Sequence, residues 1–237
     1  MPSSNISYLL DGFKLIAKPG LRRYALIPLL INIVVFIALL CVSYHYVGEL
    51  NQTIARHLPS WAQWLSGLVW LLFFIGYLLI FVYAFVTIGN IITAPFNSLL
   101  AEKVEAYLTG KTPTSTSLWQ TIKDIPRLLK RQTQIIFYYL LRAIFLWLLF
   151  FIPVVQLFAV AIWFLFNAWI MSLQYLDYPT DNHKIDFATM KTFAQKQRVT
   201  SLSFGSCVLI ASLIPILNFF VIPAAVAGAT KWWVETK

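Results

Sequence analysis

Two adjacent arginines follow a glycine near the start of the chain, in the stretch Pro19-Gly20-Leu21-Arg22-Arg23. Glycine allows close approach of the backbone, and a helix that begins here would point its first N–H groups and the positive end of its dipole the same way. The two guanidinium groups add rigid, permanently charged donors. This combination suits a tetrahedral oxyanion such as sulfate or phosphate. The alternative is that Arg22 and Arg23 only anchor a membrane span.

Arg142 is a further candidate because it interrupts an otherwise apolar region. A charge at the centre of a bilayer costs about 2.5 kcal/mol or more, so this side chain should face protein or water. Glu102 and Glu105, one turn apart on a short predicted helix, are candidate partners. A translocation pathway past these three residues is the functional interpretation. The alternative is that Arg142 reaches to the membrane surface.

The segment Asp177–Lys184 holds two carboxylates and His183, but nothing supplies further ligands at the spacing of a metal site. We therefore expect a structured turn, with Pro179 ending one helix and Asp181 or Asn182 capping the next. The sequence also lacks a Gly-Lys-Ser/Thr phosphate loop, a Gly-x-Ser-x-Gly elbow and a Cys/His cluster. We expect no enzyme, no cofactor and no metal ion.

Composition sets the class of protein. Of 237 residues, 59% are hydrophobic and only 11% are charged, against about 25% charged in soluble domains. We expect a single membrane domain over 1–237. The net charge of +9 comes from basic residues that flank apolar segments, which predicts contact with the lipid bilayer and no binding of nucleic acid.

Ala25–Val47 and Leu65–Gly89 are predicted as two full membrane spans. A polar section then begins with Ala94-Pro95-Phe96-Asn97, where we expect a helix to start, and Gly110 should end that helix. Basic residues number four before the first span, one after it and six after the second. The positive-inside rule therefore predicts a cytoplasmic amino terminus.

Two later stretches, 143–176 and 199–230, contain no Asp, Glu, Lys or Arg, and each is interrupted by a proline, Pro153 or Pro215. Two crossings need over about 40 residues, whereas half of either stretch gives about 15 helical residues, or about 22 Å. We therefore expect two re-entrant helical hairpins that turn at the prolines, where Gln156 and Asn218 can bond freed backbone groups. The alternative for each is one long kinked span with an interfacial tail. Hairpins would also keep the polar loop Asp177–Arg198, with its four basic residues from Lys184 on, inside.

Several ordered motifs at matching spacing resemble the CysZ family of bacterial sulfate permeases over nearly the whole chain. They are Gly12-Phe13-Lys14 with Pro19–Arg23, Ala94-Pro95-Phe96-Asn97 with Leu100-Ala101-Glu102, Phe164-Leu165-Phe166 with Ala168-Trp169, Gln174-Tyr175 with Asp177-Tyr178-Pro179, Asp181–Lys184, Ile214-Pro215 with Leu217-Asn218, and Gly228-Ala229-Thr230.

The resemblance implies sulfate uptake across the bacterial inner membrane for cysteine synthesis, with sulfate bound at Gly20, Leu21, Arg22 and Arg23. It implies an all-helical multi-pass fold with two long transmembrane helices and two pairs that only part-penetrate. It also implies a homo-oligomer with subunits paired in opposite orientations, which conflicts with the basic-residue count. Tyr107 and Lys231 depart from the family's pattern. Alternatives are a non-transporting scaffold that regulates another transporter, and a broader oxyanion channel.

Overall fold

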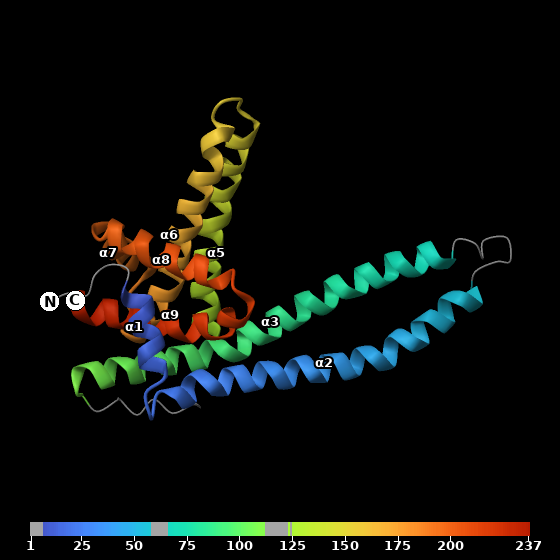
Figure 1. Ribbon diagram of the computed structural model, residues 1–237, viewed down its shortest axis with the longest axis horizontal. Helices are drawn as coiled ribbons and strands as arrows, with labels where there is room; N and C mark the ends of the chain where they lie inside the picture. The colour runs from blue at the N-terminus through green and yellow to red at the C-terminus, as the bar shows by residue number, and fades with distance from the viewer. Residues whose placement is uncertain (1–6, 58–65, 112–122, 124) are drawn as a thin grey trace. The chain divides into compact units, whose positions relative to one another are not determined.

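The computed structural model describes residues 7–57, 66–111, 123 and 125–237, and every regular element in these ranges is a helix (Figure 1). The expected all-α class is confirmed. Within these described ranges, five helices are long and apolar enough to cross a membrane. Contacts divide the chain into unit 1, residues 1–26 and 94–237, and unit 2, residues 27–93.

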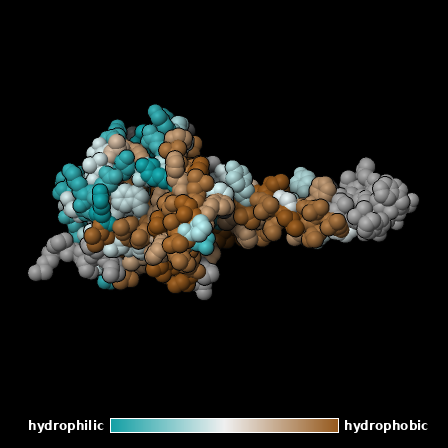
Figure 2. Space-filling view, turned by 90° about the horizontal axis from the view of Figure 1, so that it is seen from above, coloured by the Kyte–Doolittle hydropathy of each residue, from teal (hydrophilic) through white to brown (hydrophobic). Residues whose placement is uncertain are grey.

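Unit 2 contains most of α2 (Arg22–His57) and the first part of α3 (Ser66–Thr109). The Phe36 ring makes edge contacts with Phe81 and Phe85, with centroids 5.9 and 5.3 Å apart. Figure 2 shows a mainly hydrophobic surface over these helices, as lipid contact requires. The segments Arg22–Tyr44 and Trp70–Gly89 each have the length and composition of a full span, in agreement with the two predicted spans.

Unit 1 is built on close helix contacts that only small residues permit. Helix α1 (Ser7–Ile16) packs along α9 (Pro215–Thr236), where a Cβ at Gly12 would lie 2.0 Å from the carbonyl oxygen of Ala224. Helix α8 (Arg198–Ser212) meets α6 (Gln156–Asn182) in the same way at Gly205. Small residues bring helix backbones close together in this manner in membrane proteins. The largest fully buried side chains are Trp232, Phe204, Leu100, Leu173, Leu176 and Met190.

Both proline-centred stretches form helical hairpins. In the first, α5 (Ile125–Leu148) continues into the short 3₁₀ helix η2 (Leu149–Phe151) and then turns back into α6, and the two helices lie side by side (Figure 1). The turn is tight, because the N–H of Val155 donates to the carbonyl of Pro153 at 2.9 Å and Val154 has φ +71°. In the second, Leu213 and Ile214 connect α8 to α9, whose first residue is Pro215. The predicted helix–turn–helix form is confirmed at both prolines.

Two details of the hairpins differ from expectation. The side chains of Gln156 and Asn218 form no hydrogen bond in the described residues, because the turns are closed by backbone bonds such as that from the N–H of Asn218 to Ile214 O at 2.8 Å. Helices α5 and α6 have 24 and 27 residues, more than the predicted 15, because both continue into their charged flanks. Part-way entry of the hairpins into the membrane stays a prediction.

Prolines inside helices account for two wrong boundaries. Pro95 lies within α3, so no helix starts there, although α3 does end before Gly110, whose φ is +68°. Pro179 lies within α6, which continues to Asn182. Prolines are tolerated where neighbouring groups bond the freed carbonyls.

The predicted polar loop Asp177–Arg198 is mostly helical. Helix α6 ends in a Schellman motif, with Lys184 at φ +57° and the N–H of Ile185 bonded to Thr180 O at 3.0 Å. Helix α7 (Phe187–Lys196) follows at once. Its cap is Asp186, which accepts from the N–H of Thr189 at 3.0 Å, and not the predicted Asp181 or Asn182.

Candidate functional site

The turn between α1 and α2 carries the two adjacent arginines. The carbonyl oxygen of Lys18 accepts from the N–H groups of Leu21 at 3.2 Å and Arg22 at 3.1 Å, and α2 begins at Arg22. Gly20 has φ +91° with open space where a Cβ would lie. An L side chain is strained at that φ, so the turn itself requires glycine. The side chain of Leu21 is buried in the hydrophobic core of unit 1 and fixes the turn there.

The backbone N–H groups at the start of α2 were expected to be free, but some of them are hydrogen-bonded in the structure. Those of Leu21 and Arg22 are bonded to Lys18, and that of Tyr24 donates to Leu21 O at 3.0 Å. The N–H groups of Gly20 and Arg23 donate to no backbone carbonyl within the described ranges. These two amides are therefore available to a ligand, whereas the amide of Leu21 is not.

Both guanidinium groups are exposed to solvent. Arg23 lies over the ring of Tyr24, with Cζ 4.9 Å from its centroid, and Nη2 donates to Tyr24 Oη at 3.2 Å. Neither arginine has a carboxylate partner in the part of the chain that the structure describes, and the guanidinium of Arg22 forms no hydrogen bond there. The positive charge of this turn is therefore not neutralised by the protein's own acids. An exposed cluster of donors without acceptors is suited to an oxyanion.

Lys18 adds a third cation to the same turn. Its Nζ donates to Tyr107 Oη at 2.5 Å and lies 4.5 Å from the centroid of that ring. Tyr107, one of the two departures from the family's pattern, thus holds a lysine four residues before Arg22. The sequence carried no signal for this pair, because the partners are 89 residues apart.

The three pathway candidates contact other groups and not one another. The carboxylate of Glu105 lies 2.8 Å from Nε2 of His183. Glu102 lies 3.6 Å from Lys103, and its buried Oε1 lacks a hydrogen bond. The expected pairing of Arg142 with Glu102 or Glu105 is not formed.

Arg142 is instead bound to an aromatic group on its own helix. Its Cζ lies 3.7 Å from the ring centroid of Tyr138, one turn earlier on α5. Tyr138 Oη accepts from Trp169 Nε1 at 3.1 Å, and Lys191 Nζ lies 5.6 Å from the same ring. Tyrosine and tryptophan are enriched at membrane–water interfaces, and long basic side chains extend toward them. For Arg142 the contacts therefore favour the second interpretation, a side chain that reaches to the interface.

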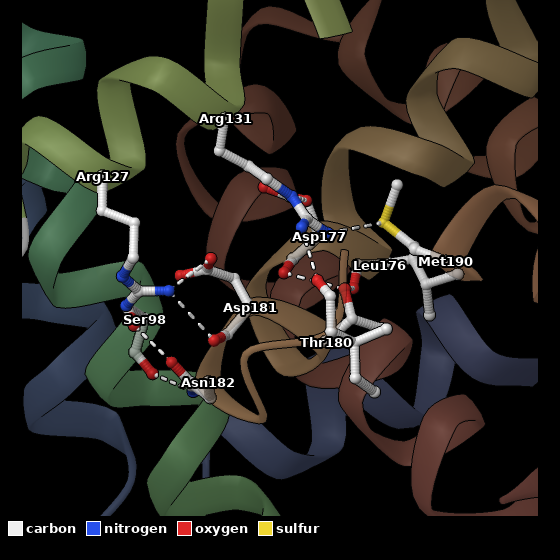
Figure 3. A network of polar contacts seen from close by, with 10 residues as sticks. Ser98, Arg127, Arg131, Leu176, Asp177, Thr180, Asp181, Asn182 and Met190 are labelled. Carbon is white, nitrogen blue, oxygen red and sulfur yellow. Dashed lines mark hydrogen bonds and ion pairs between the residues drawn. The ribbon is translucent and has the colours of Figure 1, made fainter. Parts of the chain in front are cut away.

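The segment Asp177–Lys184, which was considered for a metal ion, takes part in a largely buried network of ion pairs and side-chain hydrogen bonds (Figure 3). Arg131 Nε donates to Asp177 Oδ1 at 2.6 Å, and Arg127 Nη1 donates to Asp181 Oδ1 at 2.6 Å. Asn182 accepts from Ser98 Oγ at 2.5 Å and donates to Ser98 O at 2.9 Å. Each aspartate thus holds an arginine, and the described residues contain no group of three or more His, Cys, Asp or Glu side chains arranged for a metal.

The sequence did contain a signal for this network. Arg127 and Arg131 are four residues apart on one helix, and Asp177 and Asp181 are four apart on another. Residues at this spacing share a helix face, so two opposite faces of matching spacing predict a pair of packed helices. Sequence reasoning missed it because the four residues were treated as separate charges.

The family model for Sulfate transporter CysZ/Etoposide-induced protein 2.4 matches residues 8–223. The chain is 44% identical over 236 residues to the sulfate transporter CysZ of Salmonella typhimurium strain LT2, covering 99% of this chain and 93% of that protein. It is 45% identical over 233 residues to the sulfate transporter CysZ of Pectobacterium atrosepticum, covering 98% of this chain and 85% of that protein.

Proposed function

The chain belongs to the Sulfate transporter CysZ/Etoposide-induced protein 2.4 family, and on this premise we propose that it carries sulfate across the bacterial inner membrane as a channel-like permease. The relatives named above are sulfate transporters and align with nearly the full chain. The uptake would feed cysteine synthesis. The five helices of the described residues that are able to span a bilayer support a multi-pass membrane protein.

Sulfate is captured at the turn from Gly20 to Arg23. One observation carries this proposal: Arg22 and Arg23 are exposed, and within the described ranges neither has a carboxylate partner. The available N–H groups of Gly20 and Arg23 add neutral donors at the positive end of α2. Leu21 contributes to the site indirectly, because its buried side chain fixes the turn. Its own N–H donates to Lys18 O and is not available to sulfate.

Selectivity against phosphate follows from the donor set. Monohydrogen phosphate carries a proton that needs an acceptor, whereas fully ionised sulfate needs only donors. A site of guanidinium and amide N–H groups leaves that proton unpaired, and unpaired polar groups are strongly disfavoured in a site built for hydrogen bonds.

Transport is driven by the sulfate gradient. Moving two negative charges inward against 100 mV costs about 4.6 kcal/mol, which is twice the 2.3 kcal/mol for one charge. No carboxylate for proton or cation coupling lies within the long apolar segments. Net uptake therefore depends on a steep gradient or on rapid consumption of sulfate inside the cell.

The membrane arrangement has α2 and α3 as full spans and the two proline-centred hairpins as part-penetrating pairs. Arg142 lies nine residues before Phe151, or about 14 Å along α5. If the segment Leu129–Phe151 crossed the bilayer, this arginine would lie near its centre, at a cost of at least about 2.5 kcal/mol. Shallow entry of the hairpin keeps Arg142, Tyr138 and Trp169 at the surface instead.

The route beyond the capture site passes Glu102, Glu105 and Arg142, and the working assembly is a homo-oligomer. Glu105 is placed on this route with its carboxylate 2.8 Å from Nε2 of His183, and no Lys or Arg holds it in the described residues. For Arg142 the contacts with Tyr138 support a second role, at the membrane surface. Neutral variants of each residue, compared for sulfate flux at unchanged sulfate affinity, separate a role in passage from a role in capture.

Sulfate titration of the purified protein tests the capture site. Arg22→Gln and Arg23→Gln should each weaken sulfate binding about tenfold or more, because a charge-assisted hydrogen bond contributes about 1.5–3 kcal/mol. Arg198→Gln is the matched control, since Arg198 is also exposed and has no partner in the described residues. Unchanged affinity in both variants would remove the site from this turn.

Flux into liposomes tests the function. Labelled sulfate should enter vesicles that contain the protein, and unlabelled phosphate should compete poorly. Binding without flux would favour the scaffold that regulates another transporter. Equal uptake of phosphate and sulfate would favour the broader oxyanion channel.

A further inference from the structure

A hollow of about 670 Å³ lies against α5 and the connection from α6 to α7, apart from the turn that carries Arg22 and Arg23. Its lining combines basic side chains with apolar ones such as Phe137, Leu141 and Ile185. The basic side chains in its wall are Arg127, Lys130, Arg131, Arg142 and Lys184.

The positive charge of this hollow is only partly neutralised. Arg127 and Arg131 hold Asp181 and Asp177. The third nearby acid, Asp186, accepts from the N–H and Oγ1 of Thr189 at the start of α7, and the pKa of Asp186 is lowered by those bonds.

Three cations of the hollow remain. Lys130, Arg142 and Lys184 are exposed, and none of them has a carboxylate partner in the described part of the chain. The hollow therefore presents three uncompensated positive charges.

A second hollow of about 450 Å³ continues from the first at Arg142, which lines both. Its other walls are apolar side chains of α5 and α6, including Phe145, Leu146 and Leu165, with Trp169. A cationic end and an apolar end thus meet at one guanidinium. The cationic end matches the charged headgroup of a phospholipid, and the apolar end matches its acyl chain. Basic pockets between helices are known sites for such headgroups.

We propose that this groove is a binding site for an anionic phospholipid. The phosphate lies on the Arg142 guanidinium, whose planar fork can donate two hydrogen bonds to a phosphate diester. Lys130 and Lys184 add charge at the headgroup end, and an acyl chain lies between Phe145 and Leu165. Charge complementarity selects an anionic lipid over a zwitterionic one. The apolar second hollow favours a lipid over a small free anion, because only a lipid has an acyl chain that can fill it.

Lipid counting on the full-length protein tests the proposal. The purified protein in an uncharged detergent is titrated with phosphatidylglycerol or phosphatidylcholine, and bound lipid is counted by native mass spectrometry. The groove variant is Lys130→Gln/Arg142→Gln/Lys184→Gln. The control, Lys111→Gln/Lys196→Gln/Arg198→Gln, removes the same charge from exposed positions outside the groove.

Affinity of the groove variant for phosphatidylglycerol should fall about a hundredfold, at about fivefold for each cation near an anionic headgroup. The control should lose less than about fivefold, the share of one cation, and binding of phosphatidylcholine should not change. Equal losses in groove variant and control would overturn the proposal, because general surface charge would then explain them.

Two further arms keep the outcome decisive. If the triple variant does not fold, Arg142→Gln alone should lower phosphatidylglycerol affinity about fivefold, and no loss would overturn the proposal. Glycerol phosphate and sulfate at millimolar concentration should not displace bound phosphatidylglycerol. Displacement by either would show that the groove recognises a small oxyanion and not a lipid.

Discussion

Gly205 on α8 lies so close to Ala168 on α6 that a Cβ at Gly205 would be 1.7 Å from the carbonyl oxygen of Ala168. Backbone cannot move aside as a flexible side chain can, so Gly205→Ala should push the two helices apart. We expect a loss of about 1–3 kcal/mol in the free energy of unfolding, as for other overpacked contacts. Thermal unfolding in detergent measures it. Gly76→Ala, a helical glycine with open space around it, should be neutral or stabilising.

The largely buried pair of Arg131 and Asp177 gives a second prediction. Removing one partner leaves a buried charge without compensation, so Arg131→Leu or Asp177→Leu alone should cost about 3–5 kcal/mol of stability. The double variant should cost less than the sum of the two single losses. A double-mutant cycle on unfolding midpoints measures the coupling. Additive losses would mean that the pair contributes no interaction of its own.

Gly20→Ala tests whether the shape of the capture turn matters for binding. The φ of +91° should make alanine unfavourable by about 1–2 kcal/mol and displace the amides at the start of α2. We expect weaker sulfate binding in a titration, with a modest loss of stability. Gly110→Ala is the matched control, since Gly110 also has positive φ and open space at its Cβ. A similar loss of sulfate affinity in both variants would contradict the prediction.

Asp11 on α1 gives the protein an acid-sensitive contact. Its hydrogen bond from Lys231, at 2.7 Å, lowers the pKa of Asp11 below the ordinary 3.8. A carboxyl whose pKa is lower in the folded state stabilises it above the unfolded pKa, and this stability is lost as pH falls through the folded value. Unfolding temperatures of the wild type should therefore decline below about pH 4. Asp11→Asn should be less stable at pH 7 and show a smaller decline in acid.

Local patterns predicted much of the fold. The prolines at 153 and 215 do mark turns, and Gly110 does follow the end of α3. These features depend on backbone chemistry that a single residue carries. The helix start with Arg22 and Arg23 was visible for the same reason.

Features that depend on contacts distant in sequence could not be predicted in the same way. Pro95 and Pro179 read as helix boundaries, yet both lie inside helices. The contact of Lys18 with Tyr107 joins segments with no shared pattern. Glu102 and Glu105 were the candidate partners of Arg142, whereas in the structure its guanidinium lies over the ring of Tyr138, one turn earlier on α5.

The depth of the first hairpin in the membrane can be measured at its tip. From Tyr138 to Phe151 is 13 residues, or about 20 Å of helix, which is short of the roughly 30 Å of hydrocarbon. In a Cys41→Ser/Cys207→Ser background, Val154→Cys should therefore resist a membrane-impermeant maleimide applied to either side of the membrane. Glu49→Cys, just after the first predicted span, should react from outside and Lys14→Cys from inside, which calibrates the assay. Reaction of Val154→Cys from outside would show that α5 and α6 cross completely.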